Sequence, residues 1–252
     1  MKAAAVLLAL LPALASAQVR DTTPHPPRTI PYTLPALDVR ASRSAVPPER
    51  LPYAVQSLIP STVSLTDATA VDAALGGIAG VQVANRFNDA VGERLTLRGM
   101  GARAQFGIRG VRVSVDGIPA TMPDGQTTLT HLDVAAITAV DVLRGPASAL
   151  WGNAAGGVVT LRTTPLLTDN ASVHATAGSH GMNRVSAGIA LTPGDASAVN
   201  VRATRQEYGG FRTHASSLKQ LASAAARWAM GSNSFWVAAH AVDYDALNPG
   251  SL

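Results

Sequence analysis

The second half of the chain alternates apolar and polar residues over long segments that are divided by short polar turns. In the first such segment Val173, Ala175 and Ala177 occupy one parity, and His174 and Thr176 occupy the other. Because successive side chains of a strand point to opposite faces, this pattern predicts strands with one apolar and one polar face. Antiparallel strands of ~10 residues with this alternation are typical of transmembrane β-barrels, but soluble antiparallel sheets have the same period. The pattern by itself leaves both alternatives open.

The N-terminus favours the membrane alternative, because it has the three parts of an export signal. Met1-Lys2 is basic, residues 3–14 are apolar, and Ala15-Ser16-Ala17 is a small-residue cleavage site. The apolar run is shorter than the ~20 residues that a membrane-spanning helix needs. We therefore expect residues 1–17 to be a signal peptide. Export from a bacterial cytoplasm leads to the periplasm, the outer membrane or the medium, and the strand length favours the outer membrane among them.

Composition and motifs exclude several other classes of function. The chain has no cysteine, so disulfides and thiolate metal sites are impossible. Its six histidines are not spaced as metal ligands, and the arginines behind the formal charge of +4 are scattered, which argues against a metal site and against nucleic acid as a partner. Gly99 begins a G-x-G-x-x-A stretch, but glycines and β-branched residues follow it where a nucleotide-binding turn needs a helix. We expect no catalytic residues and no cofactor held by the chain itself.

The region between the signal and the alternating segments divides into an arm and a small domain. Five prolines between residues 21 and 37 predict an extended arm, which we place at residues 18–50. After it, alternating stretches at residues 81–83, 94–98 and 111–115 predict strands. A helix that ends at Gly80 is predicted to place four apolar residues on one face, namely Val71, Ala74, Leu75 and Ile78. The expected core of this domain is Val55, Leu75, Leu95, Val113, Val115, Val142 and Val159.

Two long stretches of this domain carry a family resemblance. They read LTLRGMGARAQFGIRGVRVSVDGIPATMPDGQTT and ITAVDVLRGPASALWGNAAGGVVTLRTT. In this order they closely resemble the plug domain of TonB-dependent outer-membrane receptors, and the resemblance extends back through residues 72–75 and 79–83, with Ala79 where the family usually has proline. It implies an α+β plug of mixed short strands and helices at residues 51–164, followed at residues 165–252 by the N-terminal antiparallel strands of a transmembrane β-barrel. Family barrels have ~22 strands, so this barrel is expected to be incomplete here.

The resemblance also implies a function, namely energy-coupled import of iron that arrives as a chelate. The stretch around residues 106–126 looks most like the ferric-citrate-type branch, so ferric citrate or a siderophore is the expected ligand. The implied partners are TonB with its inner-membrane energising proteins, the iron chelate and outer-membrane lipid. Two alternatives stay open: an exported plug-only binding module without transport activity, and an exported hydrolase.

Roles for individual residues follow from the resemblance and from the extended arm. The TonB box is expected at Leu37, Asp38, Val39, Arg40 and Ala41, where an extended segment can add to a partner's sheet edge. Ligand contacts are expected in three apical loops, from Arg86, Asn88, Arg103, Gln105, Met122, Asp124 and Gln126. Arg98 and Arg144 are expected to pair with carboxylates on the barrel wall or, alternatively, within the plug. The expected structural glycines are Gly99, Gly117, Gly145, Gly152, Gly156 and Gly157.

An incomplete barrel has an open sheet edge, which predicts how the chain behaves when it is expressed alone. Strands of residues 165–252 have too few neighbours to close, so we expect aggregation or proteolytic clipping near Thr164. The plug has its own apolar core and is expected to fold on its own, although only marginally at this size.

Overall fold

The computed structural model describes residues 54–58, 69–84, 88–105, 107–163, 169–194 and 196–250. The predicted signal peptide, the arm with its TonB box at residues 37–41, Arg86 and the predicted plug boundary at Thr164 lie outside the described residues.

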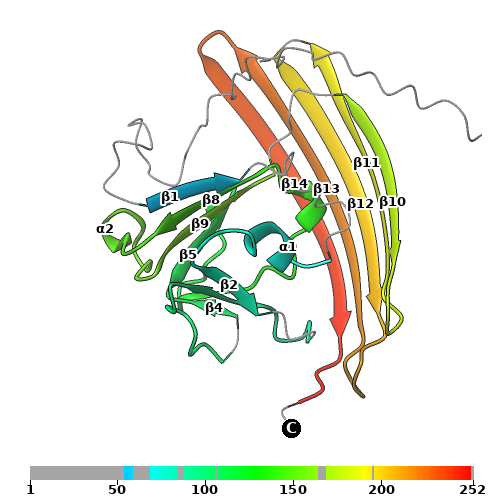
Figure 1. Ribbon diagram of the computed structural model, residues 1–252. Coiled ribbons are helices and arrows are strands. Elements are labelled where there is room, and N and C mark those ends of the chain that lie inside the picture. The colour runs from blue at the N-terminus through cyan, green and yellow to red at the C-terminus, as the bar shows by residue number, and fades with distance from the viewer. Residues whose placement is uncertain are drawn as a thin grey trace, which may run out of the picture. The chain divides into compact units, whose positions relative to one another are not determined.

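The plug is built on a five-stranded sheet with the strand order β1-β8-β9-β5-β6 (Figure 1). These strands are β1 (Ala54–Leu58), β8 (Ala139–Arg144), β9 (Gly157–Arg162), β5 (Val111–Val115) and β6 (Ile118–Pro119). Strands β5 and β9 are parallel, and the other neighbours are antiparallel. Five of the six residues of β8 and of β9 are buried, so both faces of these central strands are covered. A near-continuous apolar run, rather than alternation, is what such a position requires.

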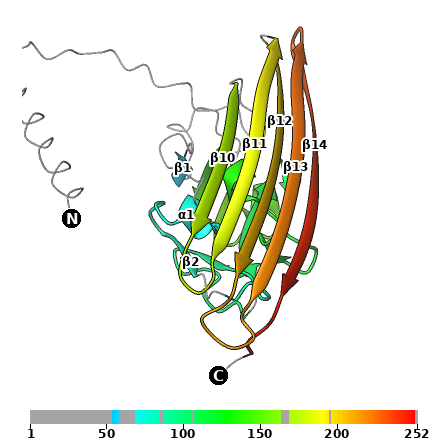
Figure 2. The same cartoon turned by 90° about the vertical axis from the view of Figure 1, so that its right-hand side faces the viewer.

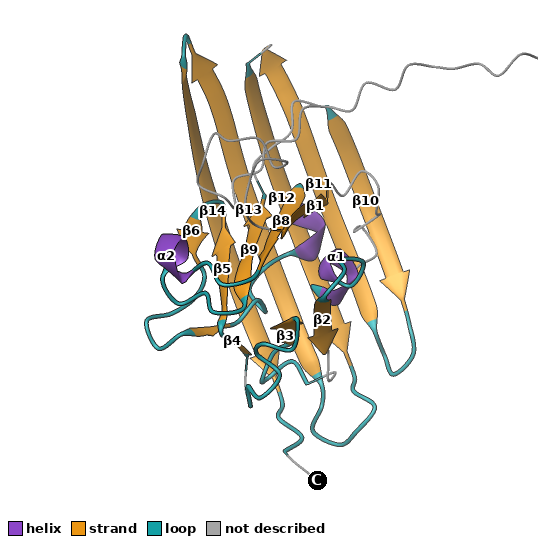
Figure 3. Cartoon of the chain, turned by 60° about the vertical axis from the view of Figure 1, so that its left-hand side comes forward, coloured by secondary structure: helices purple, strands orange, loops and turns teal. Residues whose placement is uncertain are grey.

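Short elements complete the plug (Figure 3). They are α1 (Asp72–Leu75), α2 (Ser148–Trp151), the 3-10 turn η3 (Val134–Ala136), and two two-stranded sheets, β2 (Val81–Ala84) with β3 (Arg94–Leu97) and β4 (Ile108–Arg109) with β7 (Gln126–Thr127). No helix in the described part of the chain has the length and apolar character needed to cross a bilayer. The mixture of short strands and helices confirms the predicted α+β plug.

Helix α1 has the predicted buried face but is shorter than predicted. Val71, Ala74, Leu75 and Ile78 are all buried, as the spacing indicated. However, the helix ends at Leu75 rather than at Gly80. Two glycines follow directly at positions 76 and 77, and glycine in a helix costs about 1 kcal/mol relative to alanine, so continuation is unfavourable.

The plug core consists of two clusters on opposite sides of the central strands. The larger cluster contains most of the predicted core, including Leu75, Leu95, Val113, Val142 and Val159. The smaller one is formed by Leu143, Ala147, Ala154 and Val158, with Val55 and Trp151 packed against it. Val55 thus packs on the plug core as predicted, but on the smaller cluster, because β1 presents this side chain to the other face of the sheet.

The second half of the chain forms one antiparallel sheet whose five strands follow sequence order (Figure 2). The strands are β10 (Asn170–Ala177), β11 (Asn183–Gly194), β12 (Ser197–Tyr208), β13 (Ser217–Met230) and β14 (Asn233–Ala246). Each pairs with the next over most of its length. The predicted meander is confirmed, and below we call this sheet the wall.

The two faces of the wall have the polarity of a membrane protein rather than of a soluble sheet. Apolar side chains on one face are exposed, among them Val185, Ile189, Val201 and Val237. Polar and charged side chains on the other face are buried, among them Arg184, Ser186, Thr204, Gln206 and Lys219. At one end of the apolar face Trp228 and Phe235 stack with ring centroids 6.1 Å apart. An outward apolar band with aromatic residues at its border is typical of the lipid-facing side of a transmembrane β-barrel.

The connections differ in length between the two ends of the wall. At one end, the connections from β11 to β12 and from β13 to β14 are two residues long. At the other end, the connections at residues 178–182 and 209–216 are longer. We call this the long-loop end of the wall.

Candidate ligand-binding site

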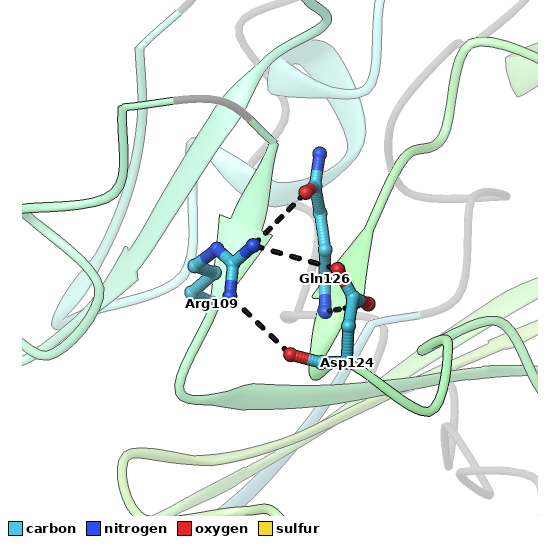
Figure 4. Close-up of polar contacts among 3 residues, drawn as sticks. All are labelled: Arg109, Asp124 and Gln126. Carbon is cyan, nitrogen blue, oxygen red and sulfur yellow. Dashed lines mark hydrogen bonds and ion pairs between the residues drawn. The ribbon is translucent and has the colours of Figure 1, made fainter.

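Arg109 lies at the centre of an exposed polar cluster on the plug (Figure 4). Its Nη2 atom donates to Oε1 of Gln126 at 3.1 Å and forms an ion pair with Oδ2 of Asp124 at 3.5 Å. Its Nη1 atom donates to the backbone carbonyl of Asp124 at 3.3 Å. The side chains of Arg109 and Asp124 are 49% and 55% exposed. The cluster therefore presents a guanidinium group to the surroundings.

The local fold explains why these residues meet. Strands β4 and β7 pair Arg109 with Gln126, so both side chains start from adjacent backbone positions. A tight turn precedes β7, in which the amide of Gly125 donates to the carbonyl of Met122 at 2.9 Å. Gly125 has a φ of +82°, a conformation that glycine adopts without strain. The turn directs the Asp124 carboxylate to Arg109, and its Oδ1 atom accepts from the Gln126 amide at 3.0 Å.

The cluster is suited to exchange one carboxylate for another. An exposed ion pair contributes only about 0–1 kcal/mol, so separating Arg109 from Asp124 costs little. A guanidinium group binds a carboxylate by two parallel hydrogen bonds, which gives an incoming ligand both energy and orientation. An anionic ligand could therefore displace the Asp124 side chain from Arg109.

The predicted ligand residues are only partly brought together. Asp124 and Gln126 join the cluster and Met122 lies on the same turn, whereas Arg103 and Gln105 are exposed on a separate loop. Asn88 lies elsewhere, and its Nδ2 atom donates to Oδ1 of Asn248, just after β14, at 3.2 Å. Their role in binding stays a prediction.

Sequence reasoning missed Arg109. The sequence feature that could have identified it is an Arg-Gly pair at the end of a strand, because Arg109-Gly110 repeats the arrangement of Arg98-Gly99.

Arg98 and Arg144 lie next to each other within the plug. Nη1 of Arg144 donates to the carbonyl of Ala79 at 2.8 Å. A Cβ atom built on Gly80 would lie 3.4 Å from Cγ of Arg98 and 3.9 Å from Cδ of Arg144. Both arginines thus pack around the turn that precedes β2, and their pairing with barrel carboxylates remains a prediction.

Among the described residues, the plug carboxylates Asp133 and Asp89 contact the wall. Oδ1 of Asp133 accepts from Nη2 of Arg184 on β11 at 2.9 Å, and Oδ2 accepts from Oγ1 of Thr204 on β12 at 2.6 Å. Asp89 accepts from Oγ of Ser217 at 2.6 Å and from Nζ of Lys219 at 3.0 Å, both on β13. In the pairs predicted for Arg98 and Arg144, the plug supplies the cation and the wall the anion. In the observed pairs the charges are reversed, because the plug supplies the anions and the wall supplies the cations.

Glu93 lies in a polar pocket where these contacts meet. The pocket is lined by Asn88, Asp89 and Glu93 of the plug and by Arg184, Gln206 and Lys219 of the wall, together with further residues. Oε1 of Glu93 accepts from the amide of Val71 at 3.0 Å. Burial raises the pKa of Glu93 to about 7, and the nearby carboxylates of Asp72 and Asp89 act in the same direction, while the Val71 amide and Lys219 oppose it. This carboxyl group can change its charge near neutral pH.

The predicted structural glycines occupy positions that other residues would strain. Gly99, Gly117, Gly145, Gly152 and Gly157 have positive φ angles. A Cβ atom on Gly157 would also lie 2.3 Å from the carbonyl oxygen of Leu143, and one on Gly156 would lie 2.7 Å from Cβ of Met100. Gly157 is thus required by close approach as well as by its positive φ, and Gly156 by close approach alone.

Comparison with known proteins agrees with this architecture. Residues 47–158 match the family described as TonB-dependent Receptor Plug Domain. The hemin receptor of Yersinia enterocolitica is 30% identical over 162 residues, which cover 63% of this chain and 22% of that receptor. This chain spans about a fifth of the length of that relative.

Solved structures share the fold. The pyoverdine outer membrane receptor of Pseudomonas aeruginosa superimposes with a TM-score of 0.64 at 20% identity, over 81% of this chain and 29% of its own. The ferric citrate transporter in its unliganded form gives 0.62 at 19% identity, over 79% of this chain and 32% of its own. The ferric yersiniabactin uptake receptor of Yersinia pestis gives 0.56 at 21% identity, over 74% of this chain and 31% of its own.

At these identities the solved structures establish the fold and leave the ligand open. The relatives named here are receptors and transporters rather than enzymes. Residues 47–158 therefore carry the plug domain of TonB-dependent receptors, and the antiparallel strands that follow share the fold of the solved receptors.

Proposed function

We propose that this chain is part of an outer-membrane receptor that binds an anionic iron chelate at the plug and imports it with energy supplied through TonB. The observation that carries the proposal is the exposed cluster of Arg109, Asp124 and Gln126, in which a guanidinium group can receive a carboxylate. The family assignment supports the receptor role, because the relatives named above include receptors for hemin and pyoverdine.

The position of the cluster supports binding from outside the cell. Transmembrane barrels have short turns on the periplasmic side and longer loops on the outer side, so the long-loop end faces outward. The hydrogen bond between Asn88 and Asn248 places a plug loop at this end. Ile108, the neighbour of Arg109, lines the same pocket as Asn88. Arg109 is therefore within the part of the plug that lies toward incoming ligand.

Ferric citrate, or another small anionic chelate such as a siderophore, fits the polar character of the cluster. A haem-like ligand is the second candidate, because two methionines border the site. Met122 is 46% exposed on the Asp124 turn, and Met100 is 47% exposed. The Met100 Cγ atom would lie 3.4 Å from a Cβ on Gly110, which adjoins Arg109. Exposed thioethers offer an apolar, adaptable surface to a flat macrocycle, while Arg109 would bind its carboxylates.

Import requires coupling to TonB, which we assign to the TonB box at residues 37–41 ahead of the plug. Outer-membrane lipid would cover the exposed apolar face of the wall. The buried contacts from Asp133 and Asp89 to three wall strands support a plug that works together with the wall. They disfavour the alternative of a plug-only binding module.

The test is binding of ferric citrate and of hemin to energy-depleted cells that carry the receptor. Arg109→Gln should weaken binding of the true ligand about tenfold, as expected for loss of a charge-assisted hydrogen bond. Arg205→Gln is the matched control, because Arg205 forms a similar exposed ion pair, with Glu207 at 3.3 Å, on the apolar face of the wall. Unchanged binding of both probes by Arg109→Gln would overturn the assignment of the site.

A further inference from the structure

The inner face of the wall is defined here as the face that carries Arg184, Thr204 and Lys219. The described Lys, Arg, Asp and Glu side chains on this face are all cationic. Because residues two apart on a strand share a face, the strand register assigns every other position to it. Four of these positions are arginine or lysine, namely Arg184, Arg202, Lys219 and Arg227. Among the residues described for β10–β14, no Asp or Glu lies on this face; Glu207, Asp243 and Asp245 are all on the outer one.

The inner cations lie at three levels along the strands. Gln206 pairs with Lys219 on one side and with Arg184 on the other, which defines the level nearest the long-loop end. Arg202 is four residues further along β12, and Arg227 pairs with Ala198, another four residues on. At 3.3 Å per residue, successive levels are about 13 Å apart along the strand. The levels therefore lead from the long-loop end toward the opposite end of the wall.

Plug carboxylates occupy the first level. Asp133 accepts from Arg184, and Asp89 accepts from Lys219. The inner face thus already binds carboxylates at this level, although they belong to the protein.

The second level holds a guanidinium group whose hydrogen bonds are incomplete. Nε and Nη1 of Arg202 are buried, and no acceptor among the described residues reaches them. In the described part of the chain several buried arginine Nε atoms share this property, but Arg202 is the one arginine for which an Nη atom does so too. Because buried donors are nearly always paired, we expect the guanidinium group of Arg202 to bind an acceptor.

The two residues paired with Arg202 on the neighbouring strands are small. On β11 it is paired with Gly188, and a Cβ atom at that position would lie 3.1 Å from Cζ of Arg202. The absence of a side chain at residue 188 is thus what allows the guanidinium group to lie against β11. On β13 the paired residue is Ser223, whose small hydroxyl can also donate to an oxyanion.

We propose that Arg202 forms a second binding site, for a carboxylate group of the anionic ligand on its way along the wall. The ligand reaches it after leaving Arg109, once the plug moves and takes Asp133 and Asp89 away from the first level. The planar fork of Arg202 accepts the carboxylate through two hydrogen bonds, and Arg227 offers the next cation. The identity of the ligand rests on the proposed function, whereas the site itself rests on the inner face of the wall.

The first experiment separates surface binding from import. Cells that carry the full receptor are given radiolabelled ferric citrate, and surface binding in energy-depleted cells is compared with the initial import rate in energised cells. Arg202→Gln should lower the import rate about tenfold while surface binding changes by less than about twofold. Arg202→Lys, which keeps the charge, should restore much of the rate. Arg205→Gln is the control, since it removes a cation from the same strand on the outer face and should change neither quantity.

The second experiment does not depend on import. The purified full receptor in lipid vesicles carries Asp133→Asn, which loosens the plug from Arg184, and is titrated with iron-free citrate, with and without the Arg202→Gln change. With the plug loosened, the Arg202→Gln protein should bind citrate about tenfold more weakly, and this difference should shrink as salt is added. If Arg202→Gln alters neither citrate affinity nor import, or if it reduces surface binding and import equally, the second site is refuted. If Arg109→Gln leaves surface binding intact while Arg202→Gln still weakens citrate binding, the proposed function fails and the wall site stands.

Discussion

Arg184 on β11 donates a hydrogen bond to the Asp133 carboxylate of the plug at 2.9 Å, and both side chains are almost fully buried. Asp133 also caps the 3-10 turn η3 by accepting from the amide of Ala135 at 3.1 Å, and it accepts from Thr204 on β12. One carboxylate therefore organises a plug turn and joins it to two strands of the wall. Because its partners come from three separate parts of the chain, the contact forms only when plug and wall are assembled.

Neutralising Asp133 should loosen the plug without destroying its local fold. Asparagine caps helical turns about as well as aspartate, so Asp133→Asn keeps η3 but leaves Arg184 buried without its counter-charge. Removing one partner of a buried ion pair typically costs about 3–5 kcal/mol. Thermal unfolding and amide exchange of the full receptor in lipid vesicles should show this loss, with faster exchange in residues 134–137. In the double variant Asp133→Asn with Arg184→Met, most of the stability should return; equal stability of the single variant and the unmodified chain would contradict this account.

Glu93 should make stability depend on pH. Its pKa is about 7 in the folded protein instead of the ordinary 4.5, mainly because it is buried. Between these values the folded protein keeps a proton that the unfolded chain has released, so stability falls as pH rises from 4.5 to about 7 and is level above that. The upper limit of the effect is about 3 kcal/mol. Glu93→Gln should remove this component in unfolding measured from pH 4 to 8; a variant that keeps the full slope would show that another group causes it.

Two plug glycines should differ in their tolerance of a methyl group. Gly157→Ala places a Cβ atom 2.3 Å from the backbone oxygen of Leu143, and backbone cannot easily move aside. Gly152→Ala meets no atom within 4 Å, so it has only the cost of the Gly152 backbone conformation, with φ +73° and ψ −123°, about 1–3 kcal/mol. In thermal unfolding of the full receptor, the midpoint temperature of Gly157→Ala should therefore be well below that of Gly152→Ala. The opposite ranking would show that the β8–β9 contact adapts.

Proline in the TonB box should separate binding from import. An extended segment that joins a partner's sheet edge donates its backbone amides, and proline lacks this donor. Leu37→Pro or Val39→Pro should therefore abolish import of the ligand while energy-depleted cells still bind it. The arm already contains Pro31 and Pro35, so it accepts proline. Thr33→Pro, which adds a proline outside the TonB box, serves as the control. Import that survives both box substitutions would place the TonB box elsewhere.

Several features of this protein follow from the sequence because they depend on neighbouring residues. The alternation of Val173, Ala175 and Ala177 with His174 and Thr176 predicted a strand with two unlike faces, and β10 has them. The spacing of Val71, Ala74, Leu75 and Ile78 predicted the buried side of α1. The order of the plug motifs predicted the plug domain of TonB-dependent receptors, which the match over residues 47–158 confirms. In each case the information lies within a few turns or strands of chain.

Other features were decided only in the folded molecule, because they join residues that are distant in sequence. Asp133 meets Arg184 and Thr204 across 51 and 71 positions, and no local pattern marks which carboxylate reaches which strand. The cluster of Arg109 with Asp124 and Gln126 depends on the register between β4 and β7, each only two residues long. Val55 packs on the smaller core rather than the larger one because the direction of β1 against β8 sets which face it shares. Local sequence determined which segments form strands and which of their faces are apolar. The pairing of charges was decided by the packing of plug against wall. A buried charge without a partner is unfavourable, so each one lies where the tertiary structure places an opposite charge beside it.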